Sequence, residues 1–489
     1  MTALLTRGFR RIVIVGAGLG GLAAACHLSG AGHRVTVVEQ ASGPGGQISR
    51  VVRDGFTFDT GPAAFCASDL LEATFAAAGT RMSDLLTLRP LEASFRACFS
   101  DGSTIHVHSS TEAMAAEIRE LCGAREAQAY VRFGRWLETV RELVRQHRPE
   151  QTLRPTSLLQ LAGAGAFRRF DDTLRRHFQD ERLVRLLGFP LTQVGLDPRR
   201  TRTATAVMAL PPLTDSLCYP EGGVAAVPAA LAEAAEKAGA TFRYGVKAQQ
   251  VRSTTSGRVR AVRLADGAEI PADVVVVNAD PATAYDTLLP SLTMPAAVRR
   301  ARHARSMYVW HVGVRGRPPG GVQHVNVHLK GRSGAHVEDS SHDQLQSQAG
   351  LALDDVPVLV NVPTISDPRL APAGSSVMSV YVPVPNLSAH IDWTVERTKA
   401  RERLRALLER WGYPTEVVTE QIVDPTAWAQ EGMAMGTPFA RTAGWLGHTP
   451  DVDRRMPGLI FTGAGTSQGP GITGALLSGK AAAHLALAG

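Results

Sequence analysis

The feature that most constrains the fold is a glycine-rich turn between an apolar segment and an alanine-rich one. Residues 12–15 are apolar and β-branched with no polar alternation, which predicts a buried strand. Gly16, Gly18 and Gly21 follow with the spacing G-x-G-x-x-G. These glycines permit a tight turn, close approach of the backbone to a pyrophosphate, and packing of the next helix on the strand. That helix begins with free N–H groups and the positive end of its dipole, both of which attract an anion.

A second apolar strand, residues 35–38, ends in Glu39, about 20 residues after the glycines. At this position a carboxylate accepts a hydrogen bond from a ribose hydroxyl in dinucleotide-binding folds. The glycine spacing alone is a weak signal. Strand, turn, helix, second strand and acid together predict a dinucleotide site rather than a glycine-rich turn that binds nothing.

Composition limits the other classes of function. A chain of 489 residues is long enough for two or three domains, and 44% hydrophobic with 20% charged residues is ordinary for a globular protein. The net charge is +7, and only five of the 52 basic residues are lysines. Nothing concentrates this charge into a nucleic-acid motif and aromatic content is only 6%, so we expect no nucleic-acid partner. An anionic membrane surface stays open as a partner.

The five cysteines are scattered and contain no C-x-x-C pair, which favours a reducing compartment and excludes a redox dithiol. We see no secretory leader and no unbroken apolar span, so we expect a cytoplasmic protein with peripheral membrane contact left open.

His324 and His328 lie four residues apart, but a metal site would need a third ligand, so we predict no metal.

Three further segments carry a resemblance to a known family. They are Glu39-Gln40 with the loop Gly43-Pro-Gly-Gly46, the segment Gly55-Phe-Thr-Phe-Asp-Thr-Gly-Pro62, and the glycine-rich residues 458–480. With the first motif they resemble the bacterial phytoene desaturase family, within the flavin amine oxidase and Rab-escort group. The resemblance covers nearly the whole chain and is most specific at its two ends.

The resemblance implies an α/β protein with a Rossmann-type FAD-binding domain, a mixed-sheet substrate domain, and a helical lid or membrane-facing region. It divides the chain into FAD-binding segments 1–70, 216–285 and 426–489, a helical lid region 71–215, and a substrate-binding sheet 286–425.

The resemblance also implies which residues contact FAD. The family usually has Arg after the double glycine, whereas this chain has Gln47, so a fixed positive charge near the cofactor is missing. No catalytic acid or base is assigned, because the flavin carries the hydride chemistry. The predicted cofactor-binding residues are Gly16, Gly18, Leu19, Gly20, Gly21, Glu39, Gln40, Gly45, Gly46, Gln47, Gly61, Pro62, Ala248, Asn278, Gly465, Gly471, Ile472 and Thr473.

The expected activity is desaturation of a carotenoid or a similar hydrophobic polyene. With one dinucleotide motif and no dithiol, we expect hydride to pass from substrate to flavin N5 and electrons to a quinone or oxygen. One alternative is a flavin oxidase or isomerase of a smaller lipophilic secondary metabolite. A remote alternative is a non-enzymatic prenyl-lipid carrier. The sequence does not determine the oligomeric state.

Several local predictions concern the middle of the chain. Residues 132–148 form an amphipathic helix whose apolar face packs in the core or docks on a membrane. We predict a hairpin turn at Asp101-Gly102, helices from 158 ending at Pro190, helices at 229–238 and 401–411, and a loop at 331–350.

Overall fold

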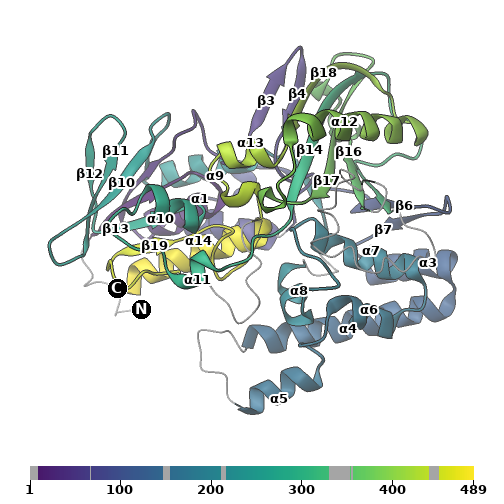
Figure 1. The fold of residues 1–489 in the computed structure, drawn as a ribbon, viewed down its shortest axis with the longest axis horizontal. Helices are drawn as coiled ribbons and strands as arrows, with labels where there is room; N and C mark the ends of the chain where they lie inside the picture. Colours follow the sequence, from purple (N-terminus) through teal and green to yellow (C-terminus); the bar gives the residue numbers. More distant parts are fainter. Residues whose placement is uncertain are drawn as a thin grey trace.

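A parallel sheet of five strands, in the order β19-β13-β1-β2-β9, is assembled from segments far apart in the sequence (Figure 1). The computed structural model describes residues 9–66, 68–146, 155–210, 216–329, 353, 356–439 and 451–488. Four of the five residues of β1 are buried, which explains why its sequence shows no alternation. The strands are β1 (Arg11–Val15), β2 (Arg34–Val38), β9 (Thr241–Arg243), β13 (Val274–Val277) and β19 (Leu459–Phe461).

Helices cover one face of the parallel sheet and a small sheet covers the other. Ile12 and Ile14 of β1 face the helices, while Val13 and Val15 face the small sheet. The predicted strand, turn and helix at the first glycine motif are therefore confirmed. The helices are α1 (Leu19–Gly30), α2 (Ser68–Ala77), α9 (Ala226–Lys237) and α14 (Gly471–Ala488). The other face carries β10 (Ala248–Ser253), β11 (Val259–Leu264), β12 (Glu269–Pro271) and α10 (Pro281–Thr287), with α11 (Ala296–Arg299) following.

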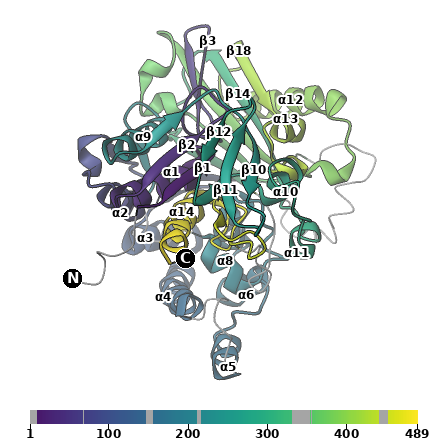
Figure 2. The ribbon, with the colours of Figure 1, turned by 90° about the vertical axis from the view of Figure 1, so that its left-hand side faces the viewer.

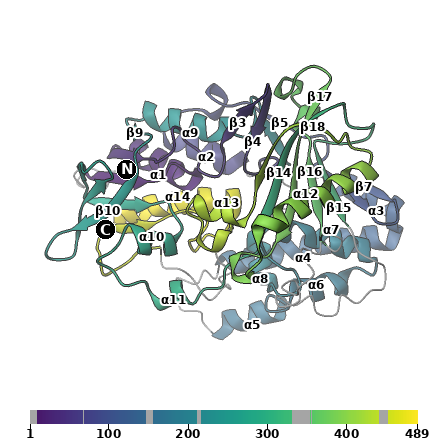
Figure 3. The same ribbon diagram turned by 45° about the horizontal axis from the view of Figure 1, so that its top comes forward.

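A second, mixed sheet has seven strands in the order β18-β14-β17-β16-β15-β6-β7. Its pairs are antiparallel except β15 with β6, which is parallel. Helix α12 (Trp393–Arg410) covers one face of this sheet (Figure 3). The strands are β6 (Phe95–Phe99), β7 (Thr104–Val107), β14 (Ser306–Arg315), β15 (Val325–Leu329), β16 (Val358–Asn361), β17 (Ser375–Val384) and β18 (Glu416–Val423). The parallel and mixed sheets confirm the predicted fold class.

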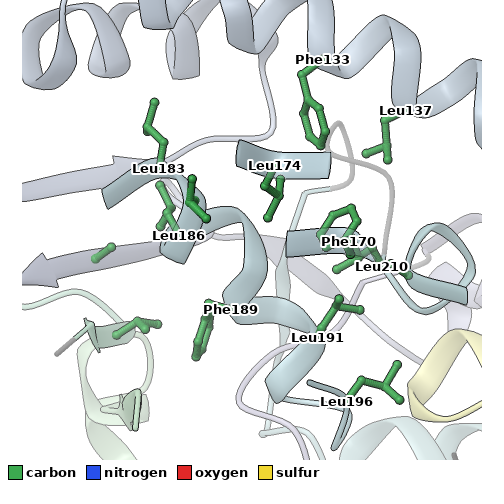
Figure 4. Close-up of a cluster of buried hydrophobic side chains, with 14 of the residues drawn as sticks. Phe133, Leu137, Phe170, Leu174, Leu183, Leu186, Phe189, Leu191, Leu196 and Leu210 are labelled. Atoms are coloured by element: carbon green, nitrogen blue, oxygen red, sulfur yellow. The ribbon is translucent and has the colours of Figure 1, made fainter. Parts of the chain in front are cut away.

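A layer of six helices covers the other face of the mixed sheet (Figure 1). Within it, Phe133 and Leu137 of α4 point toward Phe170 and Leu174 of α6 (Figure 4). The apolar face of the amphipathic helix is therefore part of the core. The helices are α3 (Thr111–Cys122), α4 (Ala124–Gln146), α5 (Pro155–Gly163), α6 (Phe170–His177), α7 (Glu181–Thr192) and α8 (Thr203–Ala209).

Short elements connect these layers. Strands β3 (Arg50–Arg53) and β4 (Phe56–Asp59) pair, as do β5 (Leu88–Pro90) and β8 (Cys218–Pro220). Helix α13 (Pro425–Gln430) follows β18. Five short 3-10 turns complete the described chain: η1 (Met82–Asp84), η2 (Pro363–Ile365), η3 (Pro368–Leu370), η4 (Leu387–Ala389) and η5 (Ala434–Gly436).

Three predicted helix ends were wrong. Helix α7 continues through Pro190 to Thr192, because a proline in the last turn removes only one backbone donor. Helix α12 begins at Trp393 rather than 401, because the carboxylate of Asp392 accepts from the N–H of Thr394 and caps it. Helix α9 begins at Ala226, three residues early. The hairpin at Asp101-Gly102 is confirmed, and the predicted loop 331–350 lies outside the described residues.

No described helix combines the length and apolar character needed to cross a bilayer.

Candidate functional site

Asn278 lies at the centre of the glycine motif. It directly follows β13, which pairs with β1, so the carboxyl ends of both strands meet at one edge of the sheet. In the amide orientation that satisfies its neighbours, Oδ1 of Asn278 accepts from the backbone N–H groups of Gly18 (3.1 Å) and Gly21 (3.3 Å). A Cβ atom at Gly18 would lie 2.8 Å from this amide. Asn278 therefore shapes the turn that the glycine spacing predicts.

Glu39 ties the end of β2 to the same turn. It is only 7% exposed, and its carboxylate accepts from the backbone N–H of Ala17 (2.7 Å) and of Ala41 (2.8 Å). A carboxylate has about four lone-pair sites, so these bonds leave capacity for a ribose hydroxyl. The carbonyl of Glu39 also accepts from the N–H of Val246 (3.0 Å), which brings the segment leading to Ala248 beside it.

The double-glycine loop packs directly on the first motif. Gly45 forms a bridge with Gly18 and donates from its N–H to the carbonyl of Ala17 (2.8 Å). A Cβ atom at the exposed Gly46 would lie 3.3 Å from Cα of Gly18. The sequence assigned these two loops to one cofactor, and the structure brings them into contact. Gln40, which follows Glu39, is exposed.

Gln47 connects this loop to two other segments. Its Nε2 donates to the carbonyl of Pro438 (3.1 Å) and lies 3.3 Å from Sδ of Met433. Its own carbonyl accepts from the hydroxyl of Thr60 (2.9 Å), next to Gly61. Where the family usually has a charged residue, this chain therefore has a neutral amide that holds the segment around 433–438.

Residues 61–63 are held by two buried side chains, Tyr381 and His324, to which the sequence analysis gave no role at the cofactor loops. The hydroxyl of Tyr381 donates to the carbonyl of Gly61 (3.0 Å), and Nε2 of His324 donates to the carbonyl of Ala63 (3.2 Å). Nδ1 of His324 then accepts from the hydroxyl of Ser366 (2.7 Å). Burial lowers the pKa of His324 to about 4, so the ring is neutral near pH 7. These contacts span about 260 to 320 positions, for which a single sequence carries no signal.

Asp59 joins the segment at 55–62 to the glycine pair 222–223. Its carboxylate accepts from the N–H of Val224 (2.8 Å) and pairs with Arg50. A Cβ atom at Gly223 would lie 1.9 Å from Oδ2 of Asp59, so only glycine fits there. Burial raises the pKa of Asp59, and the neighbouring Arg50 opposes this shift.

The C-terminal glycine loop reaches the same centre. The N–H of Gly463 donates to the hydroxyl of Ser478 (2.8 Å), and a Cβ atom at Gly463 would lie 2.7 Å from the amide of Asn278. Asn278 therefore lies between the N-terminal and C-terminal motifs. Gly465 and Pro62 are partly exposed, and Gly471, at the start of α14, lies against Val194 beyond the end of α7.

The open backbone donors fit a dinucleotide. Within the described residues, the N–H groups of Leu19 and Gly20 at the start of α1 donate to no protein acceptor. The same holds for Gly471, Ile472 and Thr473 at the start of α14. Two such helix ends can receive a pyrophosphate and the polar edge of a flavin. The assignment of each predicted residue as an FAD contact stays a prediction.

The two histidines raised as a possible metal pair have separate partners. His324 bonds to Ser366 and Ala63, whereas His328 stacks on Trp411 at 3.6 Å and contacts the hydroxyl of Tyr413 (3.2 Å). Across the described part of the chain, no group of three or more His, Cys, Asp or Glu side chains is arranged to hold a metal.

Comparison with known proteins agrees with this geometry. Residues 19–487 match the model of the family "Flavin containing amine oxidoreductase". The chain is 36% identical to phytoene dehydrogenase of Streptomyces griseus, over 97% of this chain and 94% of that protein. It is 32% identical to the zeta-carotene-forming phytoene desaturase of Myxococcus xanthus, over 96% and 92% respectively.

Solved structures show the same fold at low identity. An oxidoreductase from Methanosarcina mazei aligns with a TM-score of 0.66 and 17% identity, over 96% of this chain and 99% of that one. Putrescine oxidase bound to putrescine aligns with a TM-score of 0.62 and 18% identity, over 99% and 100%. The cofactor of this family is a flavin, and the loops described above fit FAD. The chain belongs to the flavin containing amine oxidoreductase family and, within it, to the phytoene desaturases.

Proposed function

We propose that this protein is an FAD-dependent desaturase that introduces carbon–carbon double bonds into a carotenoid or a similar hydrophobic polyene. The observation that carries the proposal is a continuous series of contacts from Glu39 through Gly18 and Gly45 to Gln47 and Gly61. This series joins the first glycine motif to the double-glycine loop and to Gly61, all of which the resemblance assigns to FAD. The names of the relatives in Streptomyces griseus and Myxococcus xanthus supply the substrate class.

The chemistry divides between cofactor and protein. When bound, FAD would supply the acceptor for a hydride from one substrate carbon while the neighbouring carbon gives up a proton, and a quinone or oxygen would take up the electrons. The protein holds the cofactor through the glycine loops and Asn278, and fixes residues 61–63 through Tyr381 and the neutral His324. No side chain is assigned as the base.

The surroundings suit an apolar substrate. Val194, beside the start of α14, packs against the large apolar cluster that joins the helical layer to the mixed sheet. That cluster includes Phe189 and Leu196 around the end of α7 and Met307 and Val309 on β14. An apolar, dry wall orients a long polyene without polar catalytic groups, which is what a reaction carried by the cofactor requires.

The test is turnover of phytoene in lipid vesicles by the purified, flavin-loaded protein with a quinone under argon. We expect flavin absorbance to bleach when phytoene is added without quinone, and longer-wavelength polyene absorbance to grow when quinone is present. The substrate class would be refuted if phytoene did not bleach the flavin of the loaded protein and the protein did not convert phytoene.

Gln47 keeps a second function open, an oxidase or isomerase of a smaller lipophilic metabolite. The neutral amide replaces the charge that the family usually places after the double glycine. Hydrogen peroxide released in step with substrate loss, or an isomer with an unchanged number of double bonds, would support this alternative. The prenyl-lipid carrier hypothesis predicts purified protein with no flavin spectrum.

A further inference from the structure

A short segment after α13, residues 433–439, begins at the junction of the two large sheets. Helix α13 lies between α10 and α12 (Figures 1 and 2), and Arg397 of α12 donates to the hydroxyl of Thr426 in α13 at 3.3 Å. On the other side, the hydroxyl of Thr283 in α10 donates to the carbonyl of Gly432 at 2.9 Å, directly before the segment. Ligand sites occur preferentially at such junctions.

The backbone of this segment is left-handed at two consecutive residues. Met435 has a φ of +55° and Gly436 a φ of +63°. The hydroxyl of Ser306 donates to the carbonyl of Gly436, and the hydroxyl of Thr437 donates to the carbonyl of Arg305 at 2.9 Å. A strained non-glycine residue such as Met435 persists only where its surroundings hold it, and such residues concentrate at active sites and ligand clamps.

Gln47 holds the segment from the double-glycine loop. Its Nε2 donates to the carbonyl of Pro438 (3.1 Å) and lies 3.3 Å from Sδ of Met433, so one amide contacts both ends of the segment. An amide nitrogen has two N–H groups, and here both have protein acceptors. The half-buried side chain of Gln47 is therefore committed to residues 433–438 rather than to a phosphate.

Phe439 extends the segment toward the start of α14. A Cβ atom at Gly195 would lie 2.8 Å from the ring of Phe439. The neighbouring Val194 lies 3.6 Å from the Cβ position of Gly471, where α14 begins with open N–H groups that suit the polar edge of a flavin. Residues 433–439 therefore connect the double-glycine loop with the C-terminal part of the cofactor site.

The side chains of Met433 and Phe439 add apolar surface to this connection. Both are partly buried against the large apolar cluster that joins the helical layer to the mixed sheet, the wall proposed for the polyene. The segment thus lies between the cofactor loops and that wall. A thioether and an aromatic ring are both polarisable and pack well on a flat, conjugated chain.

We propose that residues 433–439 cover the flavin ring and support the polyene beside it, and that Gln47 is a positioning residue that fixes this segment. The inference rests on the proposed desaturation. It gives the side chain of Gln47 a role in placing the substrate, in contrast to the cofactor contact that the family resemblance implies. A misplacement of about 1 Å can slow a reaction roughly 100-fold, so losing the Gln47 contacts should slow hydride transfer more than it weakens FAD binding.

The first test is Gln47→Leu, which nearly keeps the size of the side chain and removes its N–H groups. Titration of the apoprotein with FAD should give an affinity within about threefold of the unchanged protein. Dithionite should reduce the bound flavin several-fold faster, because the segment covers the ring less completely. An unchanged rate of reduction per bound flavin, or a loss of FAD affinity without faster reduction, would overturn the proposal.

Hydride transfer gives the second readout. With saturating phytoene dispersed in detergent under argon, the flavin of Gln47→Leu should bleach about 10- to 100-fold more slowly. Gln47→Arg should bleach within about threefold of the unchanged protein, because Nε of arginine is as many bonds from Cα as Nε2 of glutamine and donates to Pro438. Equal bleaching by Gln47→Leu and the unchanged protein would overturn the positioning role.

The matched control is Gln179→Leu, which makes the same change at an exposed position between α6 and α7. We expect unchanged bleaching by phytoene and unchanged reduction by dithionite in this control. If phytoene did not bleach the unchanged protein, the proposed function would fail. Reduction by dithionite would still test the position of the segment, because it needs no substrate.

Met433→Ala tests the supporting surface itself. We expect the phytoene concentration for half-maximal bleaching to rise several-fold, since apolar contact with the polyene is lost, while FAD affinity stays unchanged. Met208→Ala, at an exposed position on α8, is the control and should leave both quantities unchanged. An unchanged half-maximal concentration in Met433→Ala, or an equal rise in both variants, would contradict contact between this segment and the polyene.

Discussion

The side-chain amide of Asn278 occupies the space that a side chain at Gly18 would need. A Cβ atom at residue 18 would lie 2.8 Å from that amide, closer than real Cβ contacts. The same amide lies against Gly463 in the C-terminal loop. One residue at the end of β13 therefore sets the spacing of both glycine loops, and the requirement for glycine at position 18 comes from the protein as well as from the cofactor.

Gly18→Val should abolish flavin retention. The larger side chain would collide with Asn278 and enter the space where the backbone approaches the pyrophosphate. The measurement is the ratio of absorbance at 450 nm to that at 280 nm after purification. Gly43→Val is the control, because a Cβ atom there meets nothing within 4 Å. A Gly18→Val protein as yellow as the unchanged one would contradict the assignment.

Asn278→Ala should weaken FAD binding by about 10- to 100-fold. It removes the acceptor for the N–H groups of Gly18 and Gly21, and each lost bond costs about 0.5–1.5 kcal/mol. Titration of the apoprotein with FAD, followed by flavin fluorescence, measures the change. Asn278→Asp keeps an acceptor oxygen but adds a negative charge beside the pyrophosphate. It should therefore keep the apoprotein's melting temperature while still losing FAD affinity. Equal FAD affinity in all three proteins would refute this role of Asn278.

Two glycine-to-alanine changes in helices should have opposite effects on stability. Gly479 of α14 packs on α1, where a Cβ atom would lie 2.5 Å from the carbonyl oxygen of Gly20, so Gly479→Ala should destabilise by about 2 kcal/mol or more. Gly134 of α4 has open space around it, so Gly134→Ala should stabilise by roughly 0.5–1 kcal/mol. Urea unfolding measures both. A stabilised Gly479→Ala variant would contradict the helix contact.

Stability should fall as pH decreases from about 6.5 to 4. Burial lowers the pKa of His311 to about 4 and that of His324 to about 4, from an ordinary value of 6.5. As pH falls through 6.5, the unfolded chain binds protons that the folded protein does not, so the free energy of unfolding decreases until about pH 4. Each histidine contributes up to roughly 3 kcal/mol to this loss.

Melting temperatures across this pH range measure the effect. His311→Gln should melt with a shallower pH dependence, whatever its stability at pH 7, because one buried titrating group is gone. The control is His390→Asn, because His390 is exposed and asparagine tolerates its φ of +52°. We expect the slope of melting temperature against pH to be unchanged in this control. If the melting temperature of His311→Gln depended on pH as steeply as that of the unchanged protein, His311 would not be a source of the loss of stability at low pH.

The local elements near the cofactor follow from the sequence because their causes are local. An unbroken β-branched run, glycines at turn positions and an alanine-rich segment each restrict the backbone over a few residues. The strand β1, the turn at 16–21 and the helix α1 could therefore be predicted without any tertiary contact. Helix ends were less predictable, since α7 continues past Pro190 and a side-chain cap begins α12 at Trp393.

Tertiary structure alone decided which distant residues meet. The amide of Asn278 reaches Gly18 in the glycine turn across about 260 positions, and the hydroxyl of Tyr381 reaches Gly61 across 320. The amphipathic pattern of α4 is compatible with a membrane or a core, and only the packing of α6 against it settles that its apolar face is buried. The sequence by itself determined the glycine loops and the class of cofactor, because backbone geometry and phosphate binding act locally. The partners of each apolar or polar face depend on long-range packing, which only the folded chain decides.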